Sequence, residues 1–231
     1  MRRAGGAVGL LRVDLHVHTT YSDDCLTTCF DVLRWAKRRR LSALAITDHN
    51  TIAGALALCK LSSLPIIVGE EIRTSSGEII GLFLKEEVPA DLPPKETVHL
   101  IREQGGLVYV PHPLDRVRRS VLDIGELMEV IGEVDLVEVF NARVTFPLDN
   151  RNAEDLARRY GLLRGAGSDA HQGFEIGQAY VEMPSFSDAQ SFLRSLAQGQ
   201  VRGRVSSPLV HVGSTCAKLA KGLMTASSSL R

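Results

Sequence analysis

Short apolar segments rich in β-branched residues alternate with longer segments of helical periodicity along most of this chain. Strands are expected at residues 12–17, 43–47, 66–69, 79–84, 107–110, 136–140, 163–166 and 179–181. Helices are expected between most of them, at residues 29–40, 51–60, 94–104, 120–131 and 150–160. This alternation is typical of βαβ units around a mainly parallel sheet, and it predicts an α/β fold.

Two regions depart from the regular alternation. Residues 70–78 are too few for a crossover helix and contain the turn-like Ser75-Ser76-Gly77, so we expect a hairpin-like excursion there. After residue 183, amphipathic helices are expected at 189–196 and at 214–223. We therefore expect one principal domain over 10–183 and a helical C-terminal appendage over 184–231 that packs on it and ends in a frayed tail.

The charge balance excludes a general attraction to polyanions. Lysine plus arginine number 27 and aspartate plus glutamate also number 27, so the formal net charge is zero. We expect neither a membrane partner nor an extended nucleic-acid surface. The apolar runs are far shorter than the roughly 20 residues of a membrane span, and the start of the chain lacks the pattern of a secretory signal. A cytoplasmic location is expected.

Pairs of polar residues mark the first two strand ends. His16 and His18 lie two apart in a strand, so both imidazoles point to one face and make a usable pair of metal ligands. Asp48 and His49 follow the next strand. His49 is a ligand candidate, whereas Asp48 is a ligand, an acceptor that orients an imidazole, or a helix cap.

Further carboxylates and imidazoles gather beside later strand ends. They are Glu70, Glu71, Glu78, His112, Asp169 and His171. Five of the seven histidines thus occupy strand-end positions, which chance placement explains poorly. The other two, His99 and His211, are expected to be ordinary helix or surface residues. Cys25 and Cys29 lie near the candidate ligands, but no CxxC pair occurs and the cysteines are expected to be reduced.

Five motifs together resemble the polymerase and histidinol phosphatase (PHP) superfamily of phosphoesterases, specifically its small stand-alone members. They run in family order and are the segments Asp14–Asp23 (DLHVHTTYSD), Ile46–Asn50 (ITDHN), Val68–Ile72 (VGEEI), Pro111–Pro113 (PHP) and Gly167–His171 (GSDAH). The resemblance implies a distorted, TIM-like (β/α)7 barrel with two or three divalent metal ions at the C-terminal ends of its strands.

The resemblance also implies a ligand set. His16, His18, Glu71 and Asp169 would hold one metal, Glu71 would bridge to a second bound by His112, and Asp23, His49 and His171 would hold a third. Glu78 stands where relatives usually carry another histidine of the second site. Its hard oxygen would favour manganese or iron over zinc at that position.

The implied activity is that of a metal-dependent phosphoesterase, in which a metal-bound water attacks the phosphorus of a small phosphorylated metabolite or nucleotide. Arg143 is the first candidate for a phosphate clamp, and the basic run Arg116, Arg118 and Arg119 could line the same mouth. Asp23 or His171 is a candidate for protonating the leaving group. The alternatives are a nuclease acting on oligonucleotide ends and a metal-binding module without catalysis; the oligomeric state stays open.

Overall fold

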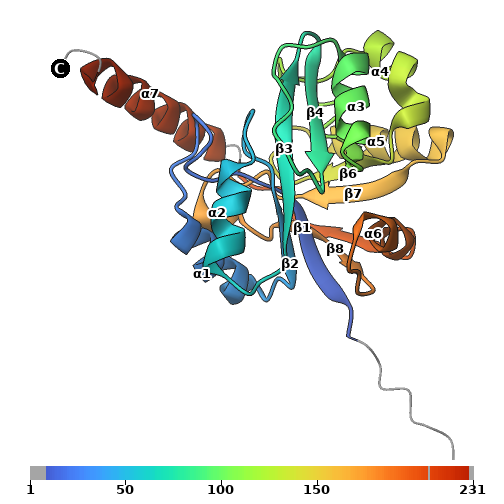
Figure 1. Ribbon diagram of the computed structural model, residues 1–231, viewed down its shortest axis with the longest axis horizontal. Coiled ribbons are helices and arrows are strands. Elements are labelled where there is room, and N and C mark those ends of the chain that lie inside the picture. The colour runs from blue at the N-terminus through green and yellow to red at the C-terminus, as the bar shows by residue number, and fades with distance from the viewer. Residues whose placement is uncertain (1–8, 208, 229–231) are drawn as a thin grey trace, which may run out of the picture.

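The computed structural model describes residues 9–207 and 209–228 (Figure 1). The strands are β1 (Leu11–Val17), β2 (Ala43–Ile46), β3 (Ile66–Thr74), β4 (Gly77–Leu82), β5 (Leu107–Val110), β6 (Leu136–Asn141), β7 (Leu163–Gly167), β8 (Ala179–Met183) and β9 (Gln200–Gly203). The α-helices are α1 (Cys29–Arg39), α2 (Ala53–Leu61), α3 (Pro94–Glu103), α4 (Ile124–Val130), α5 (Pro147–Tyr160), α6 (Ala189–Leu196) and α7 (Val210–Ser228).

The strands form one sheet in the order β7-β6-β5-β4-β3-β2-β1-β8-β9. The pairs β1–β2, β2–β3, β5–β6 and β6–β7 are parallel. The sheet curls until the segment after β7 meets the end of β1, where the His18 amide donates to the Ala170 carbonyl at 3.0 Å. The fold is thus a nearly closed, distorted TIM-like barrel, which confirms the predicted α/β class.

The expected hairpin joins β3 and β4, which pair antiparallel from Gly69–Leu82 to Thr74–Gly77. Gly77 has a φ of +119°, and a Cβ there would lie 2.4 Å from the Cα of Leu122, so this tight turn requires glycine. Strand β3 runs five residues further than residue 69, the end expected from the sequence. Glu70 and Glu71 therefore lie inside a strand rather than past its end, and their side chains point to opposite faces.

The barrel interior is filled by apolar side chains beneath the strand ends. Leu15, Leu107, Tyr109, Leu136 and Ala166 belong to one buried cluster. Helices close around it because each has an apolar face and local end signals. In α1, for example, the Thr28 hydroxyl accepts from the Asp31 amide at the N-terminus, and Val32 and Ala36 are buried.

The largest differences from the predicted helix boundaries are in α4 and α7. Helix α4 begins at Ile124, where the Asp123 carboxylate caps two amides, so residues 120–123 belong to a loop and not to the helix expected at 120–131. Helix α7 starts four residues before the expected 214 and continues to Ser228, past the expected start of the frayed tail at 225. Residues 229–231 lie outside the described part of the chain.

The segment after residue 183 is not purely helical. Strand β9 pairs antiparallel with β8, and Phe192 of α6 packs edge-on against Phe83 and Phe186. This segment therefore extends the barrel's sheet and core instead of only covering it. In the described residues we find no helix long and apolar enough to cross a membrane.

Candidate metal centre

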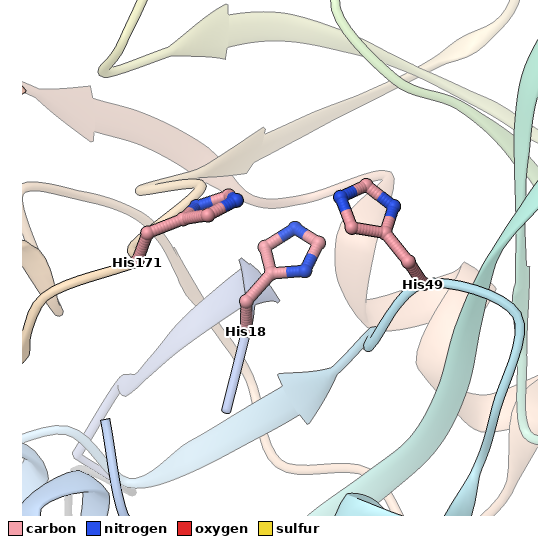
Figure 2. Close-up of side chains that lie close together, drawn as sticks. All are labelled: His18, His49 and His171. Atoms are coloured by element: carbon pink, nitrogen blue, oxygen red, sulfur yellow. The ribbon is translucent and has the colours of Figure 1, made fainter. Parts of the chain in front are cut away.

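Imidazoles and carboxylates from several strand ends converge at one mouth of the barrel. His16 and His18 come from β1 and the residue after it, Glu71 from β3, and Asp169 from the turn after β7. Figure 2 shows the rings of His18, His49 and His171 close together, and the centroid of His18 lies 4.6 Å from that of His49 and 4.2 Å from that of His171. All of the histidines predicted as ligands are brought to this cluster.

The Nε2 atoms of His16 and His18 both lie close to one oxygen of Glu71 and one oxygen of Asp169. His16 Nε2 lies 3.1 Å from His18 Nε2, 3.3 Å from Glu71 Oε2 and 3.6 Å from Asp169 Oδ1. His18 Nε2 lies 3.2 Å from Glu71 Oε2 and 3.5 Å from Asp169 Oδ1. Donors about 2.1 Å from a tetrahedral cation would be about 3.4 Å apart. Five of the six edges of a tetrahedron through these four atoms match that length, so the four residues suit one divalent cation.

Glu71 also reaches a second group of donors. Its other oxygen, Oε1, lies 3.1 Å from His112 Nε2, and Glu78 Oε2 lies 3.7 Å from the same nitrogen. Glu78 Oε1 is 3.8 Å from His49 Nδ1. Since one carboxylate faces both groups with different oxygens, it is placed to bridge two cations. The replacement of the usual histidine by Glu78 keeps a donor at this position.

A third group differs from the prediction by one residue. Asp24 Oδ2 lies 3.1 Å from His171 Nε2 and 3.6 Å from His49 Nε2. Asp23, the residue expected there, points outward: its side chain is 63% exposed and lies 3.2 Å from Lys218 Nζ. The structure therefore does not bring Asp23 to the cluster, and Asp24 occupies the expected place. Two adjacent aspartates gave the sequence no means of choosing between them.

Burial and mutual charge shift the pKa of these groups strongly. Burial raises the pKa of Glu71, but the charges of His16 and His49 outweigh it and hold that pKa well below its usual range. Burial lowers the pKa of His49, but the Glu71, Asp24 and Glu78 carboxylates raise it to about 10. Burial and the positive charge of neighbouring side chains lower the pKa of His171 to about 4. Such a cluster exchanges protons for cations when metal binds.

Buried polar atoms without hydrogen-bond partners supply an independent test of the fit. Among the described residues, Glu71 Oε2, Glu78 Oε2 and Asp169 Oδ1 are buried and accept no hydrogen bond. Asp24 Oδ1 and His112 Nδ1 also lack a partner. Burying a carboxylate oxygen unpaired is costly, so oxygens of this kind are normally paired or bound to a cation. The donors fit divalent metal.

Glu138 of β6 contacts two of the candidate metal ligands through its two carboxylate oxygens. Its Oε1 lies 3.1 Å from His16 Nδ1, while its Oε2 accepts from the His112 amide at 2.8 Å and from Asn141 Nδ2 at 2.9 Å. The same Asn141 nitrogen lies 3.1 Å from Asp169 Oδ2. Gly167 of β7 must be a glycine, because a Cβ there would lie 2.2 Å from His16 Cβ and 2.7 Å from Glu138 Oε1. The sequence analysis missed this role, although Glu138 is a carboxylate inside an apolar strand.

Asp48 acts through the loop after β1 rather than as a ligand. Its carboxylate accepts from the Thr19 amide at 2.6 Å and from the Ser22 hydroxyl at 2.7 Å. The Ser22 oxygen lies 3.1 Å from His18 Nδ1 and accepts from the His49 amide at 3.1 Å. Of the three interpretations left open for Asp48, the structure supports orientation of an imidazole, by way of Ser22.

Glu70 and Cys25 are buried close by but do not join the cluster. Glu70 faces away from Glu71 and accepts from the Val88 amide at 2.9 Å. Cys25 donates from its thiol to the His171 carbonyl at 3.1 Å, and burial raises the pKa of this thiol to about 12. The thiol is committed to the His171 carbonyl, and Cys25 belongs to none of the donor groups of the described residues that could hold a metal, which indicates a structural role. His99 is exposed beside Glu103, and the side chain of His211 lies outside the described part of the chain.

A cavity of about 710 Å³ opens over the donors and is lined by Asp24, His49, Glu78 and His171. Arg118 enters it from the loop after β5 and contacts Asp169 Oδ2. Arg143, the expected clamp, reaches the cavity wall but is committed to other partners: its Nε lies 3.3 Å from Glu175 Oε1, and Nη2 donates to the Ser214 hydroxyl at 2.8 Å. Arg118 is thus the guanidinium placed at the centre.

Comparisons with known proteins agree with this geometry. A family model described as PHP domain matches residues 14–165, and one described as PHP-associated matches residues 147–201. Uncharacterized protein MJ0417 of Methanocaldococcus jannaschii is 40% identical over 176 residues, covering 74% of this chain and 70% of that protein.

Solved structures share the fold at low sequence identity. A two-domain protein containing a predicted PHP-like metal-dependent phosphoesterase from Bacteroides vulgatus is 18% identical, with a TM-score of 0.64 over 84% of this chain and 65% of that one. The lesion-specific endonuclease PfuEndoQ from Pyrococcus furiosus is 14% identical, with a TM-score of 0.63 over 83% of this chain and 57% of that one. Because the PHP domain model covers more than half of the chain, the protein belongs to the PHP domain family.

Proposed function

We propose that this protein is a metal-dependent hydrolase of phosphomonoesters, acting on a small phosphorylated metabolite or a nucleotide with two or three divalent cations. The observation that carries the proposal is the group of donors His16, His18, Glu71 and Asp169, whose oxygens Glu71 Oε2 and Asp169 Oδ1 are buried, accept no hydrogen bond and lie within 3.6 Å of both imidazoles. Manganese, iron and zinc all suit such a mixture of imidazole and carboxylate donors.

Each cation position has its own donors in this proposal. This group of donors holds the first, Glu71 with His112 and Glu78 the second, and Asp24 with His49 and His171 the third. Bound cations would activate water for attack on phosphorus and neutralise the phosphoryl oxygens. Three divalent cations carry two more positive charges than the four carboxylates of the set, so the loaded centre would attract a phosphate dianion.

Arg118 is the proposed phosphate clamp. Its side chain is 19% exposed and lines the cavity, where it contacts Asp169 Oδ2 and its Nε lies 3.5 Å from Asp115 Oδ2. A guanidinium can grip two phosphoryl oxygens with paired hydrogen bonds. Arg143 instead forms a buried ion pair with Glu175 and supports the cavity wall.

His171 is not carried forward as the acid that protonates the leaving group. Its Nδ1 lies 2.9 Å from the Asp169 carbonyl, which can only accept, so Nδ1 bears the ring proton. Nε2 lies 3.1 Å from Asp24 Oδ2, and once bound to the third cation it would have no proton to give. Asp23 lines the cavity, but its side chain is 63% exposed and paired with Lys218 Nζ, so it is not carried forward either.

The direct test is phosphate release from a mononucleotide and a sugar phosphate by the purified chain with added manganese. We expect activity in the wild type and its loss in His16→Ala and Asp169→Ala. His99→Ala, which removes an exposed imidazole, is the matched control and should keep full activity. Wild-type activity in both ligand variants would refute the proposal.

Hydrolysis of oligonucleotide ends is the alternative, because the same centre can cleave diesters and one protein of the same fold is an endonuclease. The zero net charge weighs against it. A labelled oligonucleotide included in the same assay separates the two activities. A module without catalysis would bind manganese, gain thermal stability and release no phosphate.

A further inference from the structure

Helix α7 presents one continuous face to the rest of the molecule. Among its described side chains, those that are buried or half-buried recur with helical spacing at Val210, Gly213, Ser214, Ala217, Ala220 and Lys221. Leu219, on another face, is 65% exposed. Residues spaced three or four apart lie on one face of a helix, so this spacing is typical of a helix that lies along a surface. The first three turns of α7 are therefore packed against the barrel mouth.

Three polar tethers hold this face in place. At the start of α7, Arg143 Nη2 donates to the Val210 carbonyl at 3.2 Å and to the Ser214 hydroxyl at 2.8 Å. One turn further on, Lys218 Nζ lies 3.2 Å from Asp23 Oδ2. At Lys221, Nζ donates at 2.5 Å to the carbonyls of both Thr20 and Ser22. The tethers lie along the helix and fix its direction as well as its position.

The tethered loop belongs to the metal centre. Ser22 contacts the ring of His18, and Asp24 reaches His49 and His171. Ser214 and Lys218 of α7 line the same cavity as Asp24 and Arg118. The helix thus forms one side of the space directly above the donors, and it crosses beside the loop after β1 in Figure 1.

We propose that α7 is a specificity-determining wall of the substrate pocket, which admits small phosphomonoesters and excludes the chain of an oligonucleotide. The proposal rests on the proposed phosphomonoesterase activity. A substrate whose phosphate lies on the donors must fit the remaining group between α7 and the loop that carries Arg118. A mononucleotide fits within 710 Å³, and in this proposal a longer chain would meet α7 as it leaves the cavity.

The test compares two esters with the same reacting group, a 5′-mononucleotide and a 5′-phosphorylated decanucleotide. The full-length double variant Lys218→Ala/Lys221→Ala removes two tethers. We expect the ratio of kcat/KM for the decanucleotide to that for the mononucleotide to rise roughly tenfold, the population shift expected when charge-assisted hydrogen bonds are lost. Removing two positive charges would by itself weaken binding of the decanucleotide, which is the longer polyanion. The loss of charge would therefore not explain a rise in the ratio of the two kcat/KM values.

Leu219→Ala is the matched control, since it truncates an exposed side chain on another face of the same helix and should leave the ratio unchanged. If the double variant still hydrolyses the mononucleotide and the ratio of the two kcat/KM values does not change, α7 is not a specificity-determining wall. That result leaves the proposed function unaffected. Equal hydrolysis of both esters by the wild type overturns the wall in the same way. If the wild type hydrolyses neither of these esters nor the sugar phosphate, the proposed function fails and the wall fails with it. Hydrolysis of the sugar phosphate alone overturns the wall and leaves the proposed function in place.

Discussion

Replacing Glu138 with glutamine tests whether one buried carboxylate positions the ligands of the metal centre. Three donors point at this group: His16 Nδ1, the His112 amide and Asn141 Nδ2. A carboxylate accepts all three, but a glutamine amide offers one oxygen and one NH₂ group. The glutamine orientation that keeps the most hydrogen bonds directs its oxygen at the His112 amide and Asn141 Nδ2. Its NH₂ group then faces His16 Nδ1.

That arrangement favours the wrong tautomer of His16. Nδ1 would then accept from the amide, and the ring proton would move to Nε2, the atom that faces His18, Glu71 and Asp169. Restoring the metal-binding tautomer leaves two donors facing each other in a buried site, which costs about 1–3 kcal/mol. Loss of a group that orients a metal ligand commonly lowers the affinity for the metal roughly 10- to 100-fold. This loss corresponds to about the same free energy as the cost of the two facing donors.

The measurement is the affinity and stoichiometry of manganese or zinc bound to the metal-stripped protein, followed by calorimetry and by metal analysis after dialysis. Glu70→Gln is the control, because Glu70 is also a buried carboxylate and stands next to Glu71, yet it faces away from the cluster. We expect weakened binding only in Glu138→Gln, with circular dichroism showing that both variants fold. Wild-type affinity in Glu138→Gln would show that our account of the support beneath His16 is incorrect.

Four further predictions concern this centre and the residues around it. Asp24→Asn should lose one bound cation and most of the phosphate release, whereas Asp23→Asn should retain both; metal analysis decides, and the reverse result restores Asp23 as the ligand. Arg118→Met should lower kcat/KM for a phosphomonoester by about 100-fold, in the range of other lost charge-stabilising groups, with unchanged metal content; an equal loss of metal would make Arg118 a structural residue instead. Arg143→Met should lower Tm by an amount that reflects about 3 kcal/mol, because it leaves the buried Glu175 carboxylate without its partner; an unaltered melting curve contradicts this. Chelation should lower Tm and added manganese restore it, since a ligand bound only to the native state stabilises that state; a melting temperature indifferent to metal contradicts a metal centre.

The histidine ligands were predictable because strand ends of an α/β barrel meet at one mouth. Because alternate residues of a strand point to the same face, His16 and His18 could be placed together without knowledge of the rest of the fold. Glu71 was distinguished from Glu70 only by the resemblance to the family. Strand alternation would have separated the two once β3 was known to run through both residues.

Residues supplied by loops were harder to predict. Asp24 and Asp23 differ by one position in a loop, where no periodicity relates sequence to direction. Arg118 was one of three arginines in a run, and the choice of side chain depends on contacts such as that of Arg116 with Asp149, which the sequence does not reveal. Strand β9 was missed because its Gln200–Gly203 segment is short and mostly exposed. Its place is set by pairing with β8 rather than by an apolar pattern of its own.

The central claim is that this mouth of the barrel holds divalent cations on the named donors. The most direct measurement is anomalous diffraction from crystals of the manganese-loaded protein. We predict one peak enclosed by His16, His18, Glu71 and Asp169, and further peaks beside His112 with Glu78 and beside Asp24 with His49. Fully loaded crystals with no peak within bonding distance of His16 and Asp169 would contradict the account.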